Sequence, residues 1–381
     1  MGDAGPPTPP PVLVQDRPGI DTIETPDESP LKEVRVLVTG FGPFKSFLIN
    51  PSWLIASALP DDLPPPATTA TSGKGKYKIK LVIHPSAIRV SYSTVSETVP
   101  ELIRLHDPDF ILHIGMAGGR DCYSLETRGH RDGYRIKDVD NLDGYLCGEC
   151  KWKRDGVPPL LYGMWDEDDV LRRWEVGVQK ELVARGFLGS AGVDENEIKK
   201  TSKTEGGDAT STKTETETET ETGTGTNFVW GNNSQNTSVE KANSNASVTG
   251  RRAEENRKRA VVKLSKDAGR FLCEYALFES LSYRWMEAEK KEKKKKKNRP
   301  TGPRDEDQQE QDEDKVRERL GKVAFLHVPG WTGVEDINRG VMIAEEAIKA
   351  LIGSWEEGAR RKTESDGKSV STFTTQNSEV Q

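Results

Sequence analysis

The sequence predicts an α/β fold, a three-layer α/β/α arrangement around a mostly parallel central sheet. Two observations lead to this prediction. Short apolar segments alternate with amphipathic ones along the chain, which is the pattern of strand–helix–strand units. The segment Asp109 to Gly115 is almost wholly apolar, as expected for a strand that is covered on both faces.

Each element follows from its local sequence. The first strand is expected over 34–39, an apolar run that ends in Gly40. A helix is expected from Asn50-Pro51-Ser52, because proline suits the first turn of a helix. The same alternation predicts strands over 77–84, 109–115 and 322–328, and helices over 91–106, 166–185 and 334–352. A further helix is expected to start near Ser265 and Asp267, which are cap-type residues, and to carry Cys273 just inside its start.

The folded part of the chain is expected to be a single domain. Only 33% of the 381 residues are apolar and 31% are charged, and much of that polarity lies in low-complexity blocks such as the Thr-Glu repeat. Such blocks cannot bury enough apolar surface to become ordered. We therefore expect one α/β domain over 33–355, disordered tails over 1–32 and 356–381, and disordered insertions at about 192–258 and 288–318.

Charge and hydropathy exclude several classes of protein. The net charge of −7 is mild, and the basic run 290–299 is followed at once by the acidic run 305–314, so a nucleic-acid partner is not expected. The N-terminus has no apolar signal core, and no apolar run approaches the length that spans a bilayer. These features predict a cytoplasmic protein without membrane contact. They do not indicate its oligomeric state.

The four cysteines do not form a disulfide framework in a chain of this length. Cys147 and Cys150 form a CxxC pair, but no second ligand pair accompanies it, so a structural or incidental role is favoured over a metal site. We expect neither a metal nor a cofactor.

Three residues carry the candidate chemistry. Cys273 near a helix start lies in the positive end of the peptide dipoles, which favours the thiolate. His327 ends an apolar strand, where open α/β sheets place their ligand sites, and Glu126 follows a glycine-rich turn. Taken singly, these would be a structural cysteine, a core histidine and a solvated carboxylate. Together they match thiol-dependent acyl transfer, with histidine as acid and base and the carboxylate orienting the ring.

Four ordered motifs resemble those of the pyroglutamyl peptidase I family of cysteine peptidases. They are Thr39-Gly40-Phe41-Gly42-Pro43-Phe44 with Asn50-Pro51-Ser52, Gly115-Met116-Ala117-Gly118-Gly119-Arg120 with Glu126, Ser265 to Cys273, and Phe325-Leu326-His327-Val328-Pro329. The resemblance implies that Cys273 is the nucleophile, His327 the acid/base and Glu126 the third member of a triad. The implied substrate is a peptide with an N-terminal pyroglutamyl residue.

The same resemblance implies a set of substrate-binding residues. Aromatic faces suit a flat, uncharged lactam ring and disfavour a charged amino terminus. Asn50 would read the lactam N–H through its main-chain carbonyl, and Arg135 resembles the arginine associated with the oxyanion region once a one-residue gap is allowed. Ser86 is a candidate for the pocket wall. The aromatic positions would be Phe41, Phe44 and Phe271, and Met116 stands where bacterial members usually have Gln.

Two alternatives remain open at this level. Met116 and the diverged segment after Glu126 are compatible with a catalytically silent relative that binds pyroglutamyl or other peptides. A nucleoside-phosphorylase-like enzyme would rest on fold analogy alone, and the sequence offers no residues that would read a base.

Overall fold

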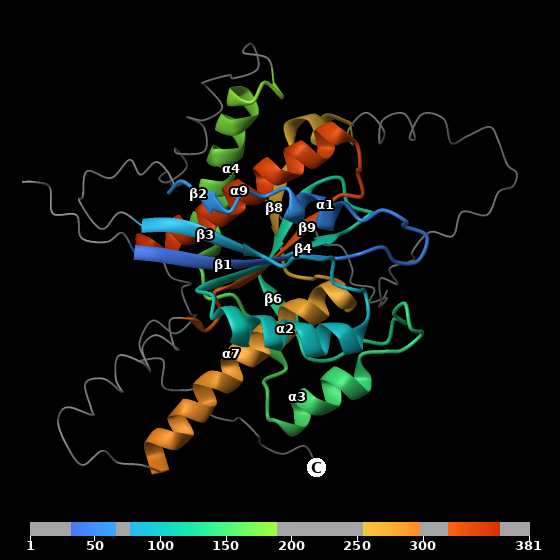
Figure 1. The fold of residues 1–381 in the computed structure, drawn as a ribbon, viewed down its shortest axis with the longest axis vertical. Coiled ribbons are helices and arrows are strands. Elements are labelled where there is room, and N and C mark those ends of the chain that lie inside the picture. The colour runs from blue at the N-terminus through green and yellow to red at the C-terminus, as the bar shows by residue number, and fades with distance from the viewer. Residues whose placement is uncertain (1–31, 66–76, 189–253, 298–318, 359–381) are drawn as a thin grey trace, which may run out of the picture.

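The computed structural model describes residues 32–65, 77–188, 254–297 and 319–358 (Figure 1). Its main sheet has seven strands in the order β2-β3-β1-β4-β9-β5-β8, and a separate two-stranded sheet joins β6 to β7. The strands of the main sheet are β1 (Lys32–Gly40), β2 (Asp62–Leu63), β3 (Tyr77–Ile83), β4 (Phe110–Met116), β5 (Tyr123–Glu126), β8 (Val262–Ser265) and β9 (Val323–Val328). The small sheet consists of β6 (Arg128–His130) and β7 (Leu160–Tyr162).

The main sheet is mostly parallel, as the sequence predicted. β1 pairs in parallel with β3 and β4, β4 pairs in parallel with β9, and β5 does so with β8. Only β2 on β3 and β5 on β9 pair antiparallel within this sheet. Because β5 runs antiparallel to β9, the last residue of β5, Glu126, lies opposite Phe325 in the middle of β9.

Helices cover both faces of the sheet and complete the three layers (Figure 1). α1 (Pro51–Ser57), α4 (Glu167–Ala184) and α9 (Val334–Glu356) lie on one face, and α2 (Tyr92–His106), α3 (Cys150–Arg154) and α7 (Leu272–Lys297) lie on the other. A π-helix, η1 (Tyr145–Glu149), leads into α3. The period of two along β1 divides the core accordingly: Val36 and Val38 join the cluster of the first face, and Leu37 joins that of the second.

The predicted helix start before Cys273 is wrong by several residues. Ser265 is the last residue of β8, where it pairs with Glu126, and Asp267 lies in the loop that follows. α7 begins only at Leu272, so Cys273 is its second residue. The apolar residues Val262 and Leu264 extend the sheet before the chain turns, and a short strand of this kind carries too little pattern to be recognised.

Parts of both predicted insertions are helical in the structure. Residues 254–259 are helical, and Arg257 within them makes two hydrogen bonds, of 2.8 and 2.6 Å, to the buried carboxylate of Asp336. Residues 288–297 continue α7 instead of leaving it, and Lys293 pairs with Glu289 one turn earlier. Charged residues spaced four apart stabilise a helix that has already nucleated on the core.

Each predicted tail also differs from the structure at one end. Lys32, assigned to the disordered N-terminal tail, is the first residue of β1, and its ammonium bonds Glu356 at 2.8 Å. Glu356, assigned to the C-terminal tail, is the last residue of α9, and Glu357 and Gly358 follow it in a turn. The remainder of the predicted disordered segments lies outside the described residues, at 1–31, 192–253, 298–318 and 359–381. Within the described parts of the chain, no helix combines the length and apolar character that crossing a bilayer requires.

Candidate active site

The candidate site forms where β4, β5 and β9 lie side by side. On β9, His327 is paired with Gly115 of β4 on one side and with Ser124 of β5 on the other. Glu126 lies opposite Phe325, two residues before His327. Residues two apart on a strand share a face, and diagonal neighbours on adjacent strands are within reach of each other, so the sheet register itself brings Glu126 to His327.

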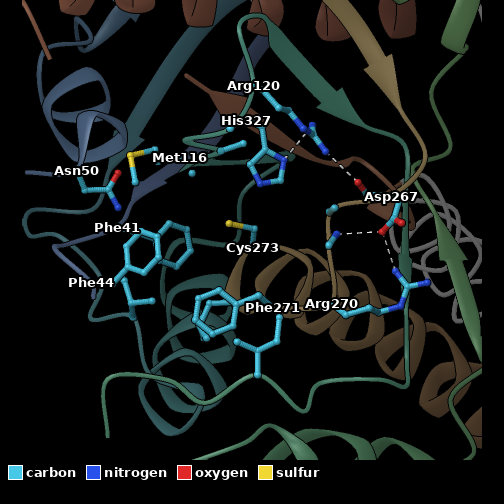
Figure 2. A pocket seen from close by; sticks show the side chains of 18 residues that line it. Phe41, Phe44, Asn50, Met116, Arg120, Asp267, Arg270, Phe271, Cys273 and His327 are labelled. Atoms are coloured by element: carbon cyan, nitrogen blue, oxygen red, sulfur yellow. Dashed lines mark hydrogen bonds and ion pairs between the residues drawn. The ribbon is translucent and has the colours of Figure 1, made fainter. Parts of the chain in front are cut away.

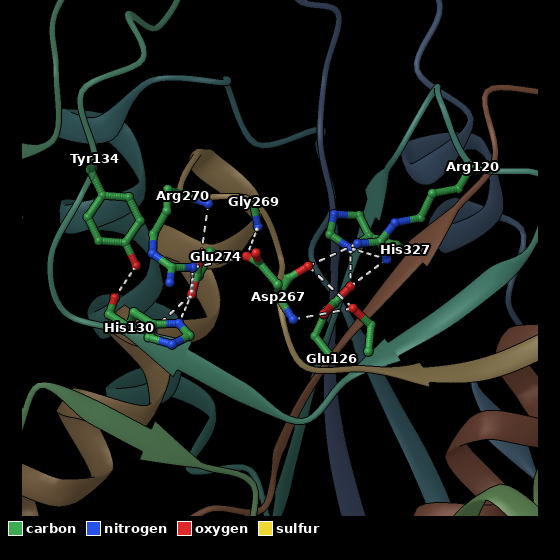
Figure 3. Close-up of polar contacts among 10 residues, drawn as sticks. Arg120, Glu126, His130, Tyr134, Asp267, Gly269, Arg270, Glu274 and His327 are labelled. Atoms are coloured by element: carbon green, nitrogen blue, oxygen red, sulfur yellow. Dashed lines mark hydrogen bonds and ion pairs between the residues drawn. The ribbon is translucent and has the colours of Figure 1, made fainter. Parts of the chain in front are cut away.

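The three residues expected to act together lie next to one another. His327 Nδ1 donates to Glu126 Oε1 at 2.7 Å, and both side chains are buried (Figure 3). Cys273 lies near enough to the imidazole for its charge to be one of the causes that raise the pKa of His327. Because Glu126 occupies Nδ1, the nitrogen that faces the sulfur is Nε2, and Cys273 lies directly across the site from the ring (Figure 2).

The electrostatics of these three residues favour charge on the imidazole. Burial alone would lower the pKa of His327, but the charges of Cys273 and Glu126 and the hydrogen bond to Glu126 outweigh it and raise the pKa to about 9. Burial likewise tends to raise the pKa of Glu126, yet its hydrogen bond to His327, the charge of His327 and the nearby Arg120 hold that pKa below its usual range. The carboxylate is therefore ionised at neutral pH and can stabilise an imidazolium.

The start of α7 places the thiol. The first hydrogen bond of the helix runs from Tyr275 N to Phe271 O, so Cys273 belongs to the first turn, where the main-chain N–H groups have no acceptor within the helix. The sulfur packs against Gly115 of β4. A methyl group at Gly115 would come within 3.1 Å of the sulfur and would overlap the Phe325 ring, so glycine permits this close approach.

A cavity of about 310 Å³ opens beside the sulfur and the imidazole. One side of it is apolar and holds Phe41, Phe44, Met116 and Phe271, all of which are buried (Figure 2). The Phe44 and Phe271 rings contact each other with centroids 6.1 Å apart. Polar residues lie at the other side of the cavity, namely Arg120, Asp267 and Arg270.

Asn50 lines the cavity, but its side chain is fully engaged elsewhere. Its Oδ1 caps α1 by accepting from Ser52 N at 3.1 Å and from Ser52 Oγ at 2.8 Å. Its Nδ2 donates to Gly42 O at 2.9 Å. The side chain thus fixes the segment around 42–52, and the main-chain carbonyl is the group of Asn50 that a ligand could meet.

Two residues expected at the site are not among those that line the cavity. Arg135 is largely exposed, and its guanidinium bonds Glu149 at 3.2 Å and lies over the Tyr145 ring. Ser86 is exposed, and its hydroxyl approaches His84 Nε2 at 3.4 Å. Contrary to expectation, the structure places both residues outside the lining of this cavity.

Arg120 is one of three polar cavity residues, with Asp267 and Arg270, that the sequence interpretation did not assign to the site. Its Nη1 donates to Glu126 Oε1 at 2.6 Å and lies 3.5 Å from His327 Nδ1, and its Nη2 donates to Asp267 O at 3.0 Å (Figures 2 and 3). It closes the glycine-rich motif quoted above, so its position was visible in the sequence. The sequence does not indicate, however, that the turn after β4 brings the Arg120 side chain to Glu126 of β5.

The remaining cysteines take no part in the site. Cys122, Cys147 and Cys150 are free thiols, like Cys273, and none of them lines the cavity. Within the described ranges, no group of three His, Cys, Asp or Glu side chains is arranged to hold a metal ion.

Comparison with known proteins finds similarity to one family over part of the chain. A family model described as pyroglutamyl peptidase matches residues 34–144. The pyroglutamyl-peptidase 1 proteins of Rattus norvegicus and Homo sapiens are each 34% identical over 146 residues, which cover 38% of this chain and 61% of theirs. A pyrrolidone-carboxylate peptidase of Fusobacterium nucleatum is 35% identical over 105 residues, covering 27% of this chain and 42% of its own. The alignment to the mammalian relatives thus spans about six-tenths of their length.

A solved structure is similar over a longer stretch at lower identity. The pyrrolidone carboxyl peptidase from Thermococcus litoralis aligns with 85% of this chain and 96% of its own, at 13% identity and a TM-score of 0.45.

Proposed function

Since the family model and the curated relatives both indicate the pyroglutamyl peptidase family, we propose that this chain is a cysteine-type omega-peptidase that removes an N-terminal pyroglutamyl residue from peptides. The observation that carries the proposal is the position of Cys273 and His327 at one cavity with apolar walls, with Glu126 hydrogen-bonded to His327. The name given to the family describes the activity, and we infer that these three side chains perform it.

In the first step, the thiolate of Cys273 attacks the pyroglutamyl carbonyl carbon, and the electron pair of the C=O bond moves onto oxygen. A pKa of about 9 keeps His327 protonated at neutral pH, so Nε2 holds a proton for the leaving amine. When the carbonyl reforms, the C–N bond breaks and the amine departs with that proton. Glu126 holds the ring through Nδ1 during both transfers.

In the second step, water hydrolyses the thioester. Nε2 of His327, now neutral, takes a proton from the water as its oxygen attacks the acyl carbon. The C–S bond then breaks, and pyroglutamate leaves with the thiolate restored. The main-chain N–H groups at the start of α7, Cys273 among them, lie next to the sulfur and would stabilise the oxyanion in both steps.

Recognition of the lactam would combine the aromatic rings with two main-chain groups. Along β4, Ile111 N and Ala117 N both donate toward β9, so the N–H of Met116 points to the β1 side. The pairing of β1 with β4 ends at Gly40 and Ile114, which leaves that N–H beyond the paired region and beside the cavity. The N–H of Met116 would bind the lactam oxygen and the carbonyl of Asn50 the lactam N–H, so a Gln side chain is not needed.

The proposed setting is the cytoplasm, and the proposed partner is a peptide rather than a nucleic acid. All four cysteines of the chain are free, which suits a reducing compartment. A catalytic thiolate requires the same condition, because oxidation of Cys273 would remove the nucleophile.

The test is release of a dye from a pyroglutamyl-amide reporter by purified, reduced protein. We expect turnover that is abolished by alkylation of Cys273 and by the substitution Cys273→Ala. The matched control is Cys122→Ala, which removes a buried thiol outside the cavity and should keep the activity. Binding of a pyroglutamyl peptide without turnover, equal in the parent and in Cys273→Ala, would support the silent relative instead.

A further inference from the structure

Glu274, the residue after Cys273, is a fully buried carboxylate whose two oxygens are bonded from outside α7. Its Oε1 accepts from His130 N at 3.0 Å and from His130 Nδ1 at 2.6 Å, and its Oε2 accepts from Arg270 N at 2.7 Å. Arg270 Nη1 lies within 2.9 Å of both oxygens. Burying a carboxylate costs free energy unless hydrogen bonds compensate it. The bonds to Glu274 provide this compensation, and they also hold the main chain of His130 and Arg270 in fixed positions next to Cys273.

The turn that precedes α7 depends on this carboxylate. Gly269 and Arg270 both adopt left-handed conformations, with φ of +92° and +50°. That conformation costs a residue other than glycine on the order of 1–2 kcal/mol, so Arg270 needs a compensating interaction. Its N–H and its guanidinium both bond Glu274, and these bonds hold the turn in place.

At its other end the carboxylate is anchored to β6. His130 closes that strand, and its main-chain carbonyl accepts a hydrogen bond from the buried hydroxyl of Tyr134 (Figure 3). The start of α7 is therefore tied through Glu274 to a second element (Figure 3). Arg270 also compensates the negative charge of Glu274, so the neighbouring thiolate does not face an uncompensated anion.

We propose that Glu274 is a positioning residue for Cys273. Its side chain fixes the turn 269–271 through its bonds to Arg270, and through this turn it sets the distance of the sulfur from His327. Glu274 does not touch the substrate. The kinetic consequences rest on the proposed function, whereas the order of the turn can be measured without any substrate.

The test uses Glu274→Gln in the full-length chain. The amide keeps the size of the side chain but loses its charge, and its NH₂ group would face donors. We expect kcat for the reporter to fall by about 10- to 100-fold, because small displacements of a reacting group have effects of this size. KM should change by less than about threefold, since the Phe271 ring is also held by Phe44 and Tyr92. Amide hydrogen exchange of residues 266–273 should become faster.

The matched control is Glu279→Gln on the same helix. Glu279 is equally buried and bonds Trp152 Nε1 at 2.9 Å and Lys151 Nζ at 3.2 Å, so it joins α7 to α3 away from the cavity. Its substitution should lower the melting temperature, yet leave kcat within about twofold and the exchange of 266–273 unchanged.

The proposal is overturned if Glu274→Gln shows unchanged hydrogen exchange and a kcat within about twofold of the parent value. It is also overturned if Glu279→Gln loses kcat to the same extent as Glu274→Gln.

If Glu274→Gln does not fold, His130→Ala replaces it. That variant removes one hydrogen bond to the carboxylate and should lower kcat by about threefold to tenfold while loosening the same turn; an unchanged turn there contradicts the proposal. If the parent protein does not cleave the reporter, the proposed function fails, and the exchange comparison alone decides the role of Glu274.

Discussion

At the scale of single residues, the charge of Glu126 governs the protonation of His327. Both side chains are buried, and the hydrogen bond and charge of Glu126 are among the causes that raise the pKa of His327 to about 9. In Glu126→Gln the amide oxygen can still accept from Nδ1, but the charge is lost. We expect kcat to fall by about 100-fold or more. The alkaline limb of the pH–kcat profile should move to lower pH, because the imidazolium then loses its proton more readily.

The measurement is the pH profile of reporter turnover for the parent and the variant. Glu149→Gln is the control, since Glu149 is also buried but bonds the main chain of Gly133 and Tyr134 away from the cavity. Its profile should keep the parental alkaline limb. An unshifted limb in Glu126→Gln would mean that this carboxylate does not determine the protonation of His327.

The candidate residues Cys273, His327 and Glu126 could be proposed from the sequence because each belongs to a compact motif. In the structure Glu126 and His327 meet through strand register, and Cys273 reaches the same cavity from the start of α7. Arg135 and Arg120 show where this fails. Both follow turns, and the direction in which a turn folds depends on tertiary contacts that leave no local pattern.

At the scale of elements, the cap of α1 links helix stability to the cavity. Asn50 Oδ1 accepts a hydrogen bond from Ser52 N, and Asn50 Nδ2 donates one to Gly42 O. Asn50→Ala should cost about 1 kcal/mol of folding free energy, the usual price of a lost cap. It should also raise KM for the reporter, because the main-chain carbonyl of residue 50 would no longer be fixed beside the cavity.

Asp166→Ala is the matched control for this prediction. Asp166 caps α4 by accepting from Asp169 N at 2.8 Å, and it does not line the cavity. Thermal unfolding should show a similar loss of stability in the two variants, whereas steady-state kinetics should show a raised KM only for Asn50→Ala. Equal KM values would contradict the link.

The elements themselves were largely predictable because their apolar periods are long. α2 begins one residue later than predicted, α9 continues from the predicted 352 to Glu356, and the ends of β1, β3, β4 and β9 differ from the predicted ranges by one or two residues. The predictions fail for segments whose structure depends on tertiary contacts rather than on their own apolar period. β8 is only four residues long, and the highly charged end of α7 is helical because it continues a helix whose first half is buried.

At the scale of the whole molecule, two buried histidines make stability depend on pH in opposite directions. The pKa of His327 is about 9 when folded and about 6.5 when unfolded. Its contribution to stability is therefore complete below pH 6.5 and is lost as the pH rises through 9. His113 behaves in the opposite way, because burial lowers its pKa from 6.5 to about 3.

His113 joins the sheet to α7 as a neutral ring. One ring nitrogen bonds Thr39 Oγ1 of β1 and the other bonds Ser280 Oγ of α7, each at 2.7 Å. Because the unfolded chain binds a proton near pH 6.5 and the folded chain only near pH 3, its contribution is complete above pH 6.5 and is lost as the pH falls through that window. The stability curve should therefore decline on the acid side for a reason distinct from the active site.

The variant His113→Gln separates this effect from other titrating groups. It should be less stable than the parent at pH 7, since the glutamine cannot reproduce both hydrogen bonds in the same space. Its unfolding free energy should nevertheless fall less steeply between pH 6.5 and 3, by up to about 1.4 kcal/mol per pH unit, the value for one proton. Urea unfolding at several pH values measures both slopes. Parallel slopes would mean that His113 does not remain neutral in the folded protein, and the acid-side loss of stability would then have to come from carboxylates.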